Sequence, residues 1–149
     1  MQKLHFSITI NTPRKKVWET VIGEKTYPKW TEPFSKGSHV LGDWSVGSKM
    51  LFLAPNAEGK MEGMVSTIAE SKPYEFLSIK HLGFVKNGIE DTKSDKVKSW
   101  LPSFENYTLK ETNGKTEFIV EMDSPDEYKE MFEKMWPNAL QKLKELSEK

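Results

Sequence analysis

Three side chains that can exchange protons share strand faces with apolar residues in the second half of the sequence. His81 has the strand parity of Ile79, and Glu105 and Tyr107 have that of Leu109. Alternate residues of a strand face the same side, so we expect all three side chains to point toward the core with these neighbours. A histidine, a carboxylate and a phenol can together supply general acid and base catalysis.

Two non-catalytic interpretations compete with this one. A carboxylate at an inward position is unfavourable unless it is paired or hydrogen-bonded, so the simplest expectation places Glu105 and His81 at the solvent-exposed rim of the sheet. They can also orient the polar end of a ligand inside a mostly apolar pocket. The sequence has 3 histidines and no motif that joins His81, Glu105 and Tyr107, so we assign no catalytic residue. If the protein is an enzyme, these three residues are the candidates.

Metal and redox chemistry have little support in the sequence. Cysteine is absent, which removes disulfides, thiolate metal ligands and cysteine nucleophiles together. His5, His39 and His81 fall on separate candidate strands without the paired spacing of a metal site. We therefore expect no metal and no cofactor.

Charge and hydropathy limit the partners. Lys plus Arg and Asp plus Glu are balanced at 22 each, whereas nucleic-acid binding usually requires a basic excess. No apolar stretch approaches the roughly 18 residues that span a bilayer. The N-terminal residues alternate in polarity and do not resemble a signal peptide. We expect a cytoplasmic protein that has no membrane span and binds no nucleic acid.

Alternation and turn residues predict the elements that position these side chains. The order is a strand, two short helices, a run of antiparallel strands and a long C-terminal helix that begins at Ser124-Pro125-Asp126-Glu127, with Ser124 as its cap. Thr12 is expected to cap the first short helix, with Pro13 at its first position. The expected short helices are Arg14–Ile22 and Lys25–Trp30, and the expected strands are Lys3–Ile10, Ser38–Leu41, Lys49–Ala54, Met61–Glu70, Tyr74–Leu82, Glu105–Lys110 and Thr116–Met122.

Residues Gly83–Pro102 form a long polar segment within this order. They contain Asn87-Gly88 and a cluster of Lys, Asp and Ser residues. A connection of this length inside a compact domain is usually functional, partly helical or mobile. We interpret it as a mobile lid, with Trp100 anchoring it near the mouth of a cavity.

These elements predict an α+β fold in one domain that spans residues 1–149. The last helix is the only element long enough to cover the apolar face of the antiparallel sheet. We expect six or seven curved strands wrapped around this helix, which is the helix-grip arrangement. A strongly curved sheet leaves space between itself and the helix, and that space is the expected ligand cavity.

Several motifs along the whole chain resemble a known family. The opening strand with Thr12-Pro13-Arg14-Lys15-Lys16-Val17-Trp18 is similar to the start of START-like (SRPBCC) domains, which share the Bet v 1-like helix-grip fold. A set of later motifs resembles the activator of Hsp90 ATPase homologue-like family: Trp30-Thr31-Glu32-Pro33-Phe34, Gly42-Asp43-Trp44-Ser45-Val46-Gly47, Glu62-Gly63-Met64-Val65, Lys72-Pro73-Tyr74, Thr116-Glu117-Phe118 and Trp136-Pro137 with Leu140. The resemblance implies hydrophobic-ligand carriers, cyclases or chaperone activators.

Aromatic residues and methionines supply candidate ligand contacts. The last helix presents an apolar stripe toward the sheet, made of Met131, Phe132, Met135 and Trp136. Such a stripe is ordinarily core. Part of it can instead line a cavity, where flexible Met side chains adapt to the shape of a ligand. Trp30, Phe34 and Trp44 lie near turns and can instead pack against the first helix. The candidate ligand-binding residues are Trp30, Phe34, Trp44, Phe52, His81, Trp100, Glu105, Tyr107, Phe118, Met131, Phe132, Met135 and Trp136.

Three functions follow, in order of preference. The first is non-catalytic binding of a small hydrophobic or amphipathic ligand between the sheet and the C-terminal helix. The second is a chaperone-contacting module that uses the outer face of the sheet, although Lys80, Lys110, Glu117 and Glu121 predict a solvated surface there. The third is a cyclase or hydrolase that uses His81 and Glu105. We expect a monomer or a weak homodimer.

Overall fold

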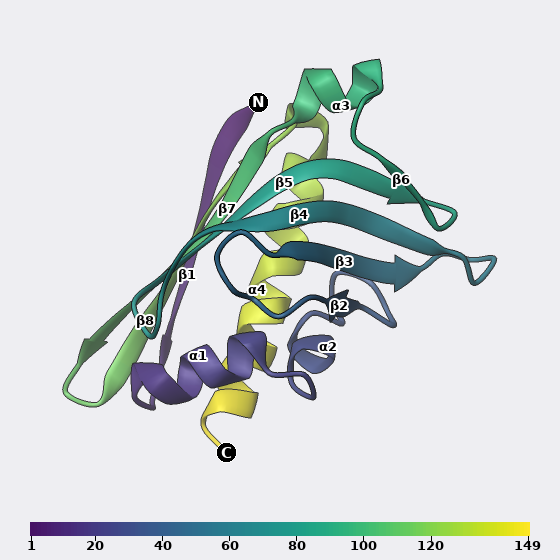
Figure 1. The fold of residues 1–149 in the computed structure, drawn as a ribbon. Helices are drawn as coiled ribbons and strands as arrows, with labels where there is room; N and C mark the ends of the chain where they lie inside the picture. The colour runs from purple at the N-terminus through teal and green to yellow at the C-terminus, as the bar shows by residue number, and fades with distance from the viewer.

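An antiparallel sheet of eight strands curves around a long C-terminal helix in the computed structural model, which describes residues 1–149 (Figure 1). The strand order is β1-β8-β7-β5-β4-β3-β2, and β6 pairs with β5 outside this path. The strands are β1 (Gln2–Ile10), β2 (His39–Leu41), β3 (Lys49–Pro55), β4 (Met61–Lys72), β5 (Phe76–Lys86), β6 (Ile89–Asp91), β7 (Ser103–Thr112) and β8 (Lys115–Ser124). The α+β helix-grip prediction is confirmed, with one strand more than expected.

The strands β1, β7 and β8 show the predicted alternation of buried apolar and more exposed polar side chains. In β1 the side chains of Leu4 and Ile10 are buried, while the polar residues between them are exposed. β1 pairs with β8 and β8 with β7, and the last pair is joined by a hairpin. The turn residues Asn113 and Gly114 have φ angles of 53° and 77°. Such positive angles fit a type I′ turn, which the Asn-Gly pair favours.

Irregularities in β4 bend the other half of the sheet. The pairing of β4 with β5 shifts register between Val65 and Ser66 and again between Ile68 and Glu70. A bulge inserts a residue, bends its strand and increases the local twist. The resulting curvature gives the sheet the concave face that α4 crosses (Figure 1).

Helices cover the concave face and close one end of it. The helices are α1 (Arg14–Ile22), α2 (Tyr27–Trp30), α3 (Asp95–Trp100) and α4 (Lys129–Ser147), with a 3₁₀ turn at Asp126–Tyr128 before α4. α4 buries Trp136, Ala139, Leu140 and Leu143 against the sheet and α1. In Figure 1, α1 and α2 lie at the end of the molecule that holds the C-terminus, and α3 lies at the opposite end.

Both predicted helix caps differ from the structure. Ser124 is the last residue of β8, and its hydroxyl donates to the carbonyl of Pro125 rather than to a helix N–H group. α4 therefore begins at Lys129, after the 3₁₀ turn. Pro13 itself occupies the cap position of α1 without a side-chain hydrogen bond, so Thr12 does not cap this helix.

The segment Gly83–Pro102 contains more regular structure than the lid interpretation assumed. β5 continues to Lys86, turns at Asn87-Gly88 and returns as β6. The segment then forms α3, whose first turn is capped by Ser94 through its contact with the Val97 N–H group. Only short stretches lie outside helices and strands: the turn at Asn87-Gly88, residues 92–94 between β6 and α3, and Leu101-Pro102 before β7.

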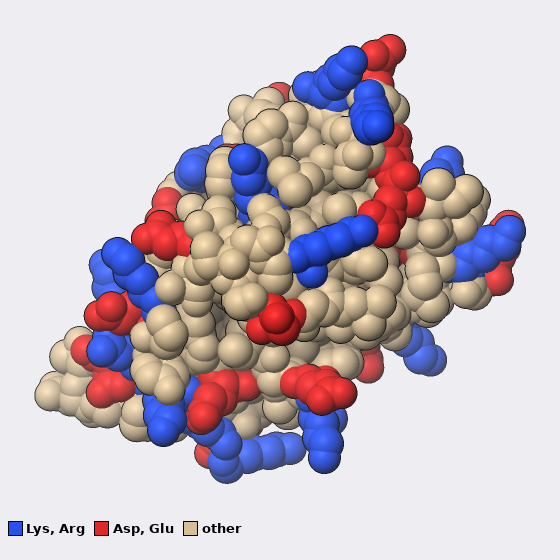
Figure 2. Space-filling view, viewed as in Figure 1, with Lys and Arg blue, Asp and Glu red and all other residues tan.

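Charges of both signs are interspersed on the surface. On the face shown in Figure 2, Lys and Arg side chains alternate with Asp and Glu around a broad area of other residues. Ion pairs of opposite charge join neighbouring elements, such as Lys49 with Glu90 at 2.7 Å. Every helix is too short or too polar to span a lipid bilayer.

Candidate functional site

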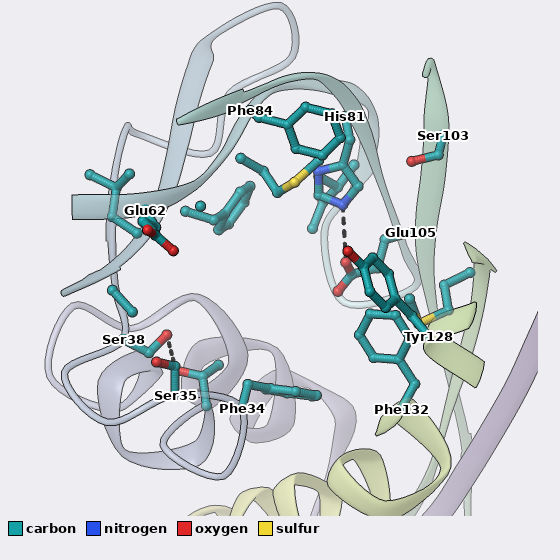
Figure 3. A pocket seen from close by; sticks show the side chains of 18 of the residues that line it. Phe34, Ser35, Ser38, Glu62, His81, Phe84, Ser103, Glu105, Tyr128 and Phe132 are labelled. Atoms are coloured by element: carbon teal, nitrogen blue, oxygen red, sulfur yellow. Dashed lines mark hydrogen bonds and ion pairs between the residues drawn. The ribbon is translucent and has the colours of Figure 1, made fainter. Parts of the chain in front are cut away.

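An open cavity lies between the concave face of the sheet and the helical side of the molecule. Its volume is about 620 Å³, and 18 of its 30 lining residues are hydrophobic. The walls come from β3, β4, β5 and β7 on the sheet side and from α2, α4 and the segment after α2 on the other. Figure 3 shows side chains from both sides pointing into the same space.

Aromatic contacts build the deep end of this cavity. Trp136 on α4 is only 2% exposed and lies with its ring centroid 4.8 Å from that of Phe34. Trp30 and Tyr107 pack against the same indole at 6.1 and 6.2 Å. Edge-to-face and tilted aromatic pairs at these distances are stabilising. They form a rigid apolar wall.

Polar side chains form a continuous hydrogen-bonded chain on the sheet, which meets the aromatic wall at Tyr107. The hydroxyl of Ser66 lies 2.7 Å from Nδ1 of His81, and Nε2 of His81 lies 3.1 Å from Oε1 of Glu105. The second carboxylate oxygen of Glu105 accepts a hydrogen bond from the hydroxyl of Tyr107. His81 and Glu105 point toward one another in Figure 3, where a dashed line joins them.

The donors in this chain can be assigned from the acceptor character of the carboxylate. An ionised carboxylate only accepts hydrogen bonds, so Nε2 of His81 must carry a hydrogen. The Ser66 hydroxyl can then donate to Nδ1, which satisfies both nitrogens of a neutral ring. The two side chains are mostly enclosed, with 13% of His81 and 18% of Glu105 exposed. They therefore lie inside the cavity rather than at the sheet's outer rim.

Two buried tyrosines face the same charge. Burial raises the pKa of Tyr107 well above its ordinary value of 10.0, and the charge of Glu105 and the hydrogen bond to it act in the same direction. Burial, followed by the charge of Glu105, also raises the pKa of Tyr27. Both phenols are consequently protonated at neutral pH and can donate hydrogen bonds there.

Ser66, His81 and Glu105 are the residue types of a hydrolase triad, but the serine hydroxyl is not accessible from the cavity. Ser66 is 1% exposed and does not line the cavity, so a substrate in the cavity cannot reach its hydroxyl. Both ring nitrogens of His81 already have partners. The chain is thus well suited to hold the carboxylate of Glu105 in one position. No group of three or more His, Asp or Glu side chains is arranged to hold a metal ion.

Most of the predicted ligand-contact residues converge on this cavity. The residues that line it are Trp30, Phe34, Phe52, His81, Trp100, Glu105, Tyr107, Met131, Phe132 and Trp136. Three others do not. Trp44 packs against Phe52 and does not itself line the cavity. Phe118 is fully buried and packs against Tyr107. Met135 is half-buried on α4 outside the cavity.

Four other residues that belong to the cavity wall or to its hydrogen-bonded chain are not predicted from the sequence. Ser66 lies next to the β4 register shift, so simple alternation does not reveal its partner. Tyr27 lies on a helix of 4 residues, too short for a periodic pattern. Phe84 falls in the segment predicted as a loop, and Tyr128 falls in the 3₁₀ turn. For Tyr27, Phe84 and Tyr128 the aromatic side chain was the available indication, and for Ser66 there was none.

Comparison with known proteins agrees with this architecture. The family model described as "Activator of Hsp90 ATPase homolog 1-like protein" matches residues 11–148. No curated protein matches the sequence.

Protein CV1439 from Chromobacterium violaceum is similar in structure, with 19% identity, coverage of 100% of this chain and 99% of that one, and a TM-score of 0.72. The Aha1 dimer from Colwellia psychrerythraea is similar with 16% identity, coverage of 99% and 97%, and a TM-score of 0.70. Protein MLL2253 from Mesorhizobium loti is similar with 16% identity, coverage of 97% and 96%, and a TM-score of 0.71.

The curved sheet around a terminal helix defines the chain as a helix-grip protein. Within that class, it belongs to the Activator of Hsp90 ATPase homolog 1-like family.

Proposed function

We propose that this protein binds a small apolar or amphipathic molecule without reacting with it, in the cavity between the curved sheet and α4. The observation that carries the proposal is the cavity itself, about 620 Å³ in volume and lined mainly by hydrophobic residues. Ligand sites typically measure about 300–1,000 Å³ and combine apolar walls with a few convergent polar groups. The chain His81–Glu105–Tyr107 supplies such polar groups.

Apolar burial provides the driving force for this binding. Each buried methylene stabilises a complex by about 0.8 kcal/mol, so a decyl chain gains ~8 kcal/mol. Loss of translational and rotational freedom subtracts from this gain. The strongest expected affinity for such a simple chain is therefore a dissociation constant of about 1 μM.

Filling the cavity tests the proposal directly. Ala54 is a small, half-buried lining residue on β3, so Ala54→Trp should occupy the ligand's space. Ala57 is exposed in the loop after β3 and does not line the cavity, which makes Ala57→Trp the matched control. Titration with Nile red, a neutral apolar dye, is expected to saturate for the wild type and for Ala57→Trp but not for Ala54→Trp. Equal binding by all three proteins would place the dye elsewhere and contradict the proposal.

Native mass spectrometry of the purified protein offers a second test. A carrier should retain a lipophilic molecule through purification, which would appear as a defined additional mass. The Ala54→Trp variant should lose that mass.

Family membership supports a second candidate, contact with a chaperone of the Hsp90 kind. The outer face of the sheet would supply the docking surface, and Lys110 and Glu117 on β7 and β8 are exposed there as predicted, which makes these positions charged rather than apolar. A pull-down with Hsp90, combined with an ATPase assay, tests this candidate. Stimulated ATP hydrolysis would support it, and Ala54→Trp should leave that stimulation unchanged because the cavity faces away from this surface.

A further inference from the structure

Apart from His81 and the N-terminal residue Met1, whose backbone carries the terminal amine, the side chains of the cavity wall that can carry a charge at neutral pH are carboxylates. The lining residues include the carboxylates of Glu62, Glu105 and Asp123 and one histidine, but neither lysine nor arginine. This absence is selective, because 22 of the 149 residues in the chain are Lys or Arg. Where basic residues are so common, a cavity of 30 lining residues without any indicates a preference among ligand charges.

Glu105 is the carboxylate that a ligand inside the cavity would meet. Asp123 is already held by the Phe104 N–H group at 2.9 Å and lies 3.7 Å from the ammonium of Lys3. Glu62 is exposed at the opening and accepts a hydrogen bond from Asn56. Glu105 is mostly enclosed, as its 18% exposure shows.

The carboxylate of Glu105 retains acceptor capacity. Oε1 accepts from His81 and Oε2 accepts from Tyr107. Two carboxylate oxygens offer about four acceptor positions, so each oxygen can take one further donor. His81 and Tyr107 hold the group in place without neutralising it when the imidazole is neutral. In that state the ionised carboxylate presents its negative charge to the cavity.

Two aromatic rings of the lining, Phe84 on β5 and Trp100 on α3, already lie close to a cation. The ammonium of Lys96 lies 5.0 Å from the ring centroid of Phe84 and 4.9 Å from that of Trp100. Both rings line the cavity, whereas Lys96 does not. Ring faces attract cations through their quadrupole, so these walls are compatible with a positively charged ligand group.

We propose that the cavity selects lipophilic amines, with the apolar body against Trp136 and Phe34 and the ammonium group hydrogen-bonded to Glu105. This inference rests on the proposed binding function and specifies its ligand class. A fatty acid that placed its carboxylate at the same position would meet the carboxylate of Glu105, on a wall that has no lysine or arginine side chain to pair with it. Burying an unpaired charge beside a like charge is strongly unfavourable.

Three ligands that differ only in the head group test this selection. Decylamine, decanol and decanoate at pH 7 carry positive, zero and negative charge, and each can be titrated by isothermal calorimetry below its micelle concentration. We expect decylamine to bind about 10- to 100-fold more tightly than decanol, the range of one charge-assisted hydrogen bond. Decanoate should bind more weakly than decanol.

Two variants assign the preference to Glu105. Glu105→Gln should bring the affinity for decylamine down to that for decanol, and unchanged decanol binding would show that the variant is folded. Glu117→Gln, on the outer face of β8, is the matched control and should keep the wild-type order. Ala54→Trp should lose all three ligands.

The outcomes separate this inference from the proposed function. If decanol and decanoate bind to the wild type as tightly as decylamine, the amine preference is refuted while the carrier function stands. Retention of the amine preference by Glu105→Gln would also refute it. If none of the three ligands binds to the wild type, the carrier function fails and the amine preference fails with it.

Discussion

Nε2 of His81 lies 3.1 Å from Oε1 of Glu105, although 24 positions separate these residues in the sequence. The contact results from the register of two neighbouring strands, in which Ile79 of β5 pairs with Glu105 of β7 and His81 pairs with Ser103. His81 therefore lies diagonally across from Glu105 on the same face of the sheet. This register brings His81 within reach of the half-buried carboxylate, and Tyr107, two residues along β7 on the same face, supplies the second donor.

Removing one donor should destabilise the fold. Tyr107→Phe leaves Oε2 of Glu105 without its partner in an enclosed site. Loss of a buried partner of this kind lowers the free energy of unfolding by ~1–3 kcal/mol. Urea denaturation measures this change. Tyr74→Phe, at an exposed position, is the control and should change stability little. A Tyr107→Phe protein as stable as the wild type would show that the contact contributes nothing.

Trp136 should be the most sensitive position of the cavity wall. It is 2% exposed and packs against Phe6, Trp30, Phe34 and Tyr107. Trp136→Ala is expected to lower the free energy of unfolding by ~3–5 kcal/mol, since a buried aromatic ring is replaced by empty space. The midpoint of urea denaturation checks this value. Met135→Ala, half-buried one residue earlier, should have a clearly smaller effect; equal losses would contradict the assignment of Trp136 as the packing centre.

Alkaline pH should unfold the protein through its buried tyrosines. The pKa values of Tyr27 and Tyr107 are raised above 10.0 in the folded state, mainly by burial. Above about pH 10 the unfolded chain loses phenolic protons that the folded chain keeps, so stability falls as pH rises. Below that pH the contribution is fully present. Phenolate absorbance and circular dichroism should therefore show these two tyrosines ionising together with unfolding. Their ionisation in a protein that stays folded would contradict this account.

The helix α3 should depend on Trp100 for its position. The indole lies 5.9 Å from the ring of Phe84 and 5.3 Å from that of Tyr128, centroid to centroid, and so joins α3 to β5 and to the turn before α4. Trp100→Ala should speed cleavage by a lysine-specific protease at Lys93–Lys98 several-fold, because local opening exposes the backbone. Bound ligand should slow this cleavage in the wild type. Cleavage rates that do not respond to Trp100→Ala or to a tight ligand would exclude a role for α3 as a lid.

The sequence predicts the framework of this molecule well because one physical pattern determines it. Strict alternation in β1, β7 and β8, together with Asn113-Gly114, predicts the strands and their hairpin. The same parity argument predicts that Glu105 and Tyr107 share a face with Leu109. The apolar residues at helical spacing near the C-terminus predict the long helix that the sheet surrounds.

The missed features lie where that pattern breaks down. The register shift at Ser66 changes which residues of β4 face inward, and no composition rule locates such a shift. β6 has 3 residues, two of them acidic, so it is too short to show an alternating pattern. Trp44 lies in a loop with φ of 65° and packs against Tyr27 and Phe52 instead of lining the cavity, a placement that depends on tertiary contacts.

The five tryptophans provide the most direct test of the cavity. Trp30, Trp100 and Trp136 line the cavity. Trp18 is on α1, is buried in the hydrophobic core and does not line the cavity. The measurement is a nuclear magnetic resonance titration with decylamine that follows the five indole N–H signals. The account predicts saturable shifts for Trp30, Trp100 and Trp136 and none for Trp18. Unchanged signals for the three lining residues at saturating ligand would contradict the existence of an open, ligand-accepting cavity.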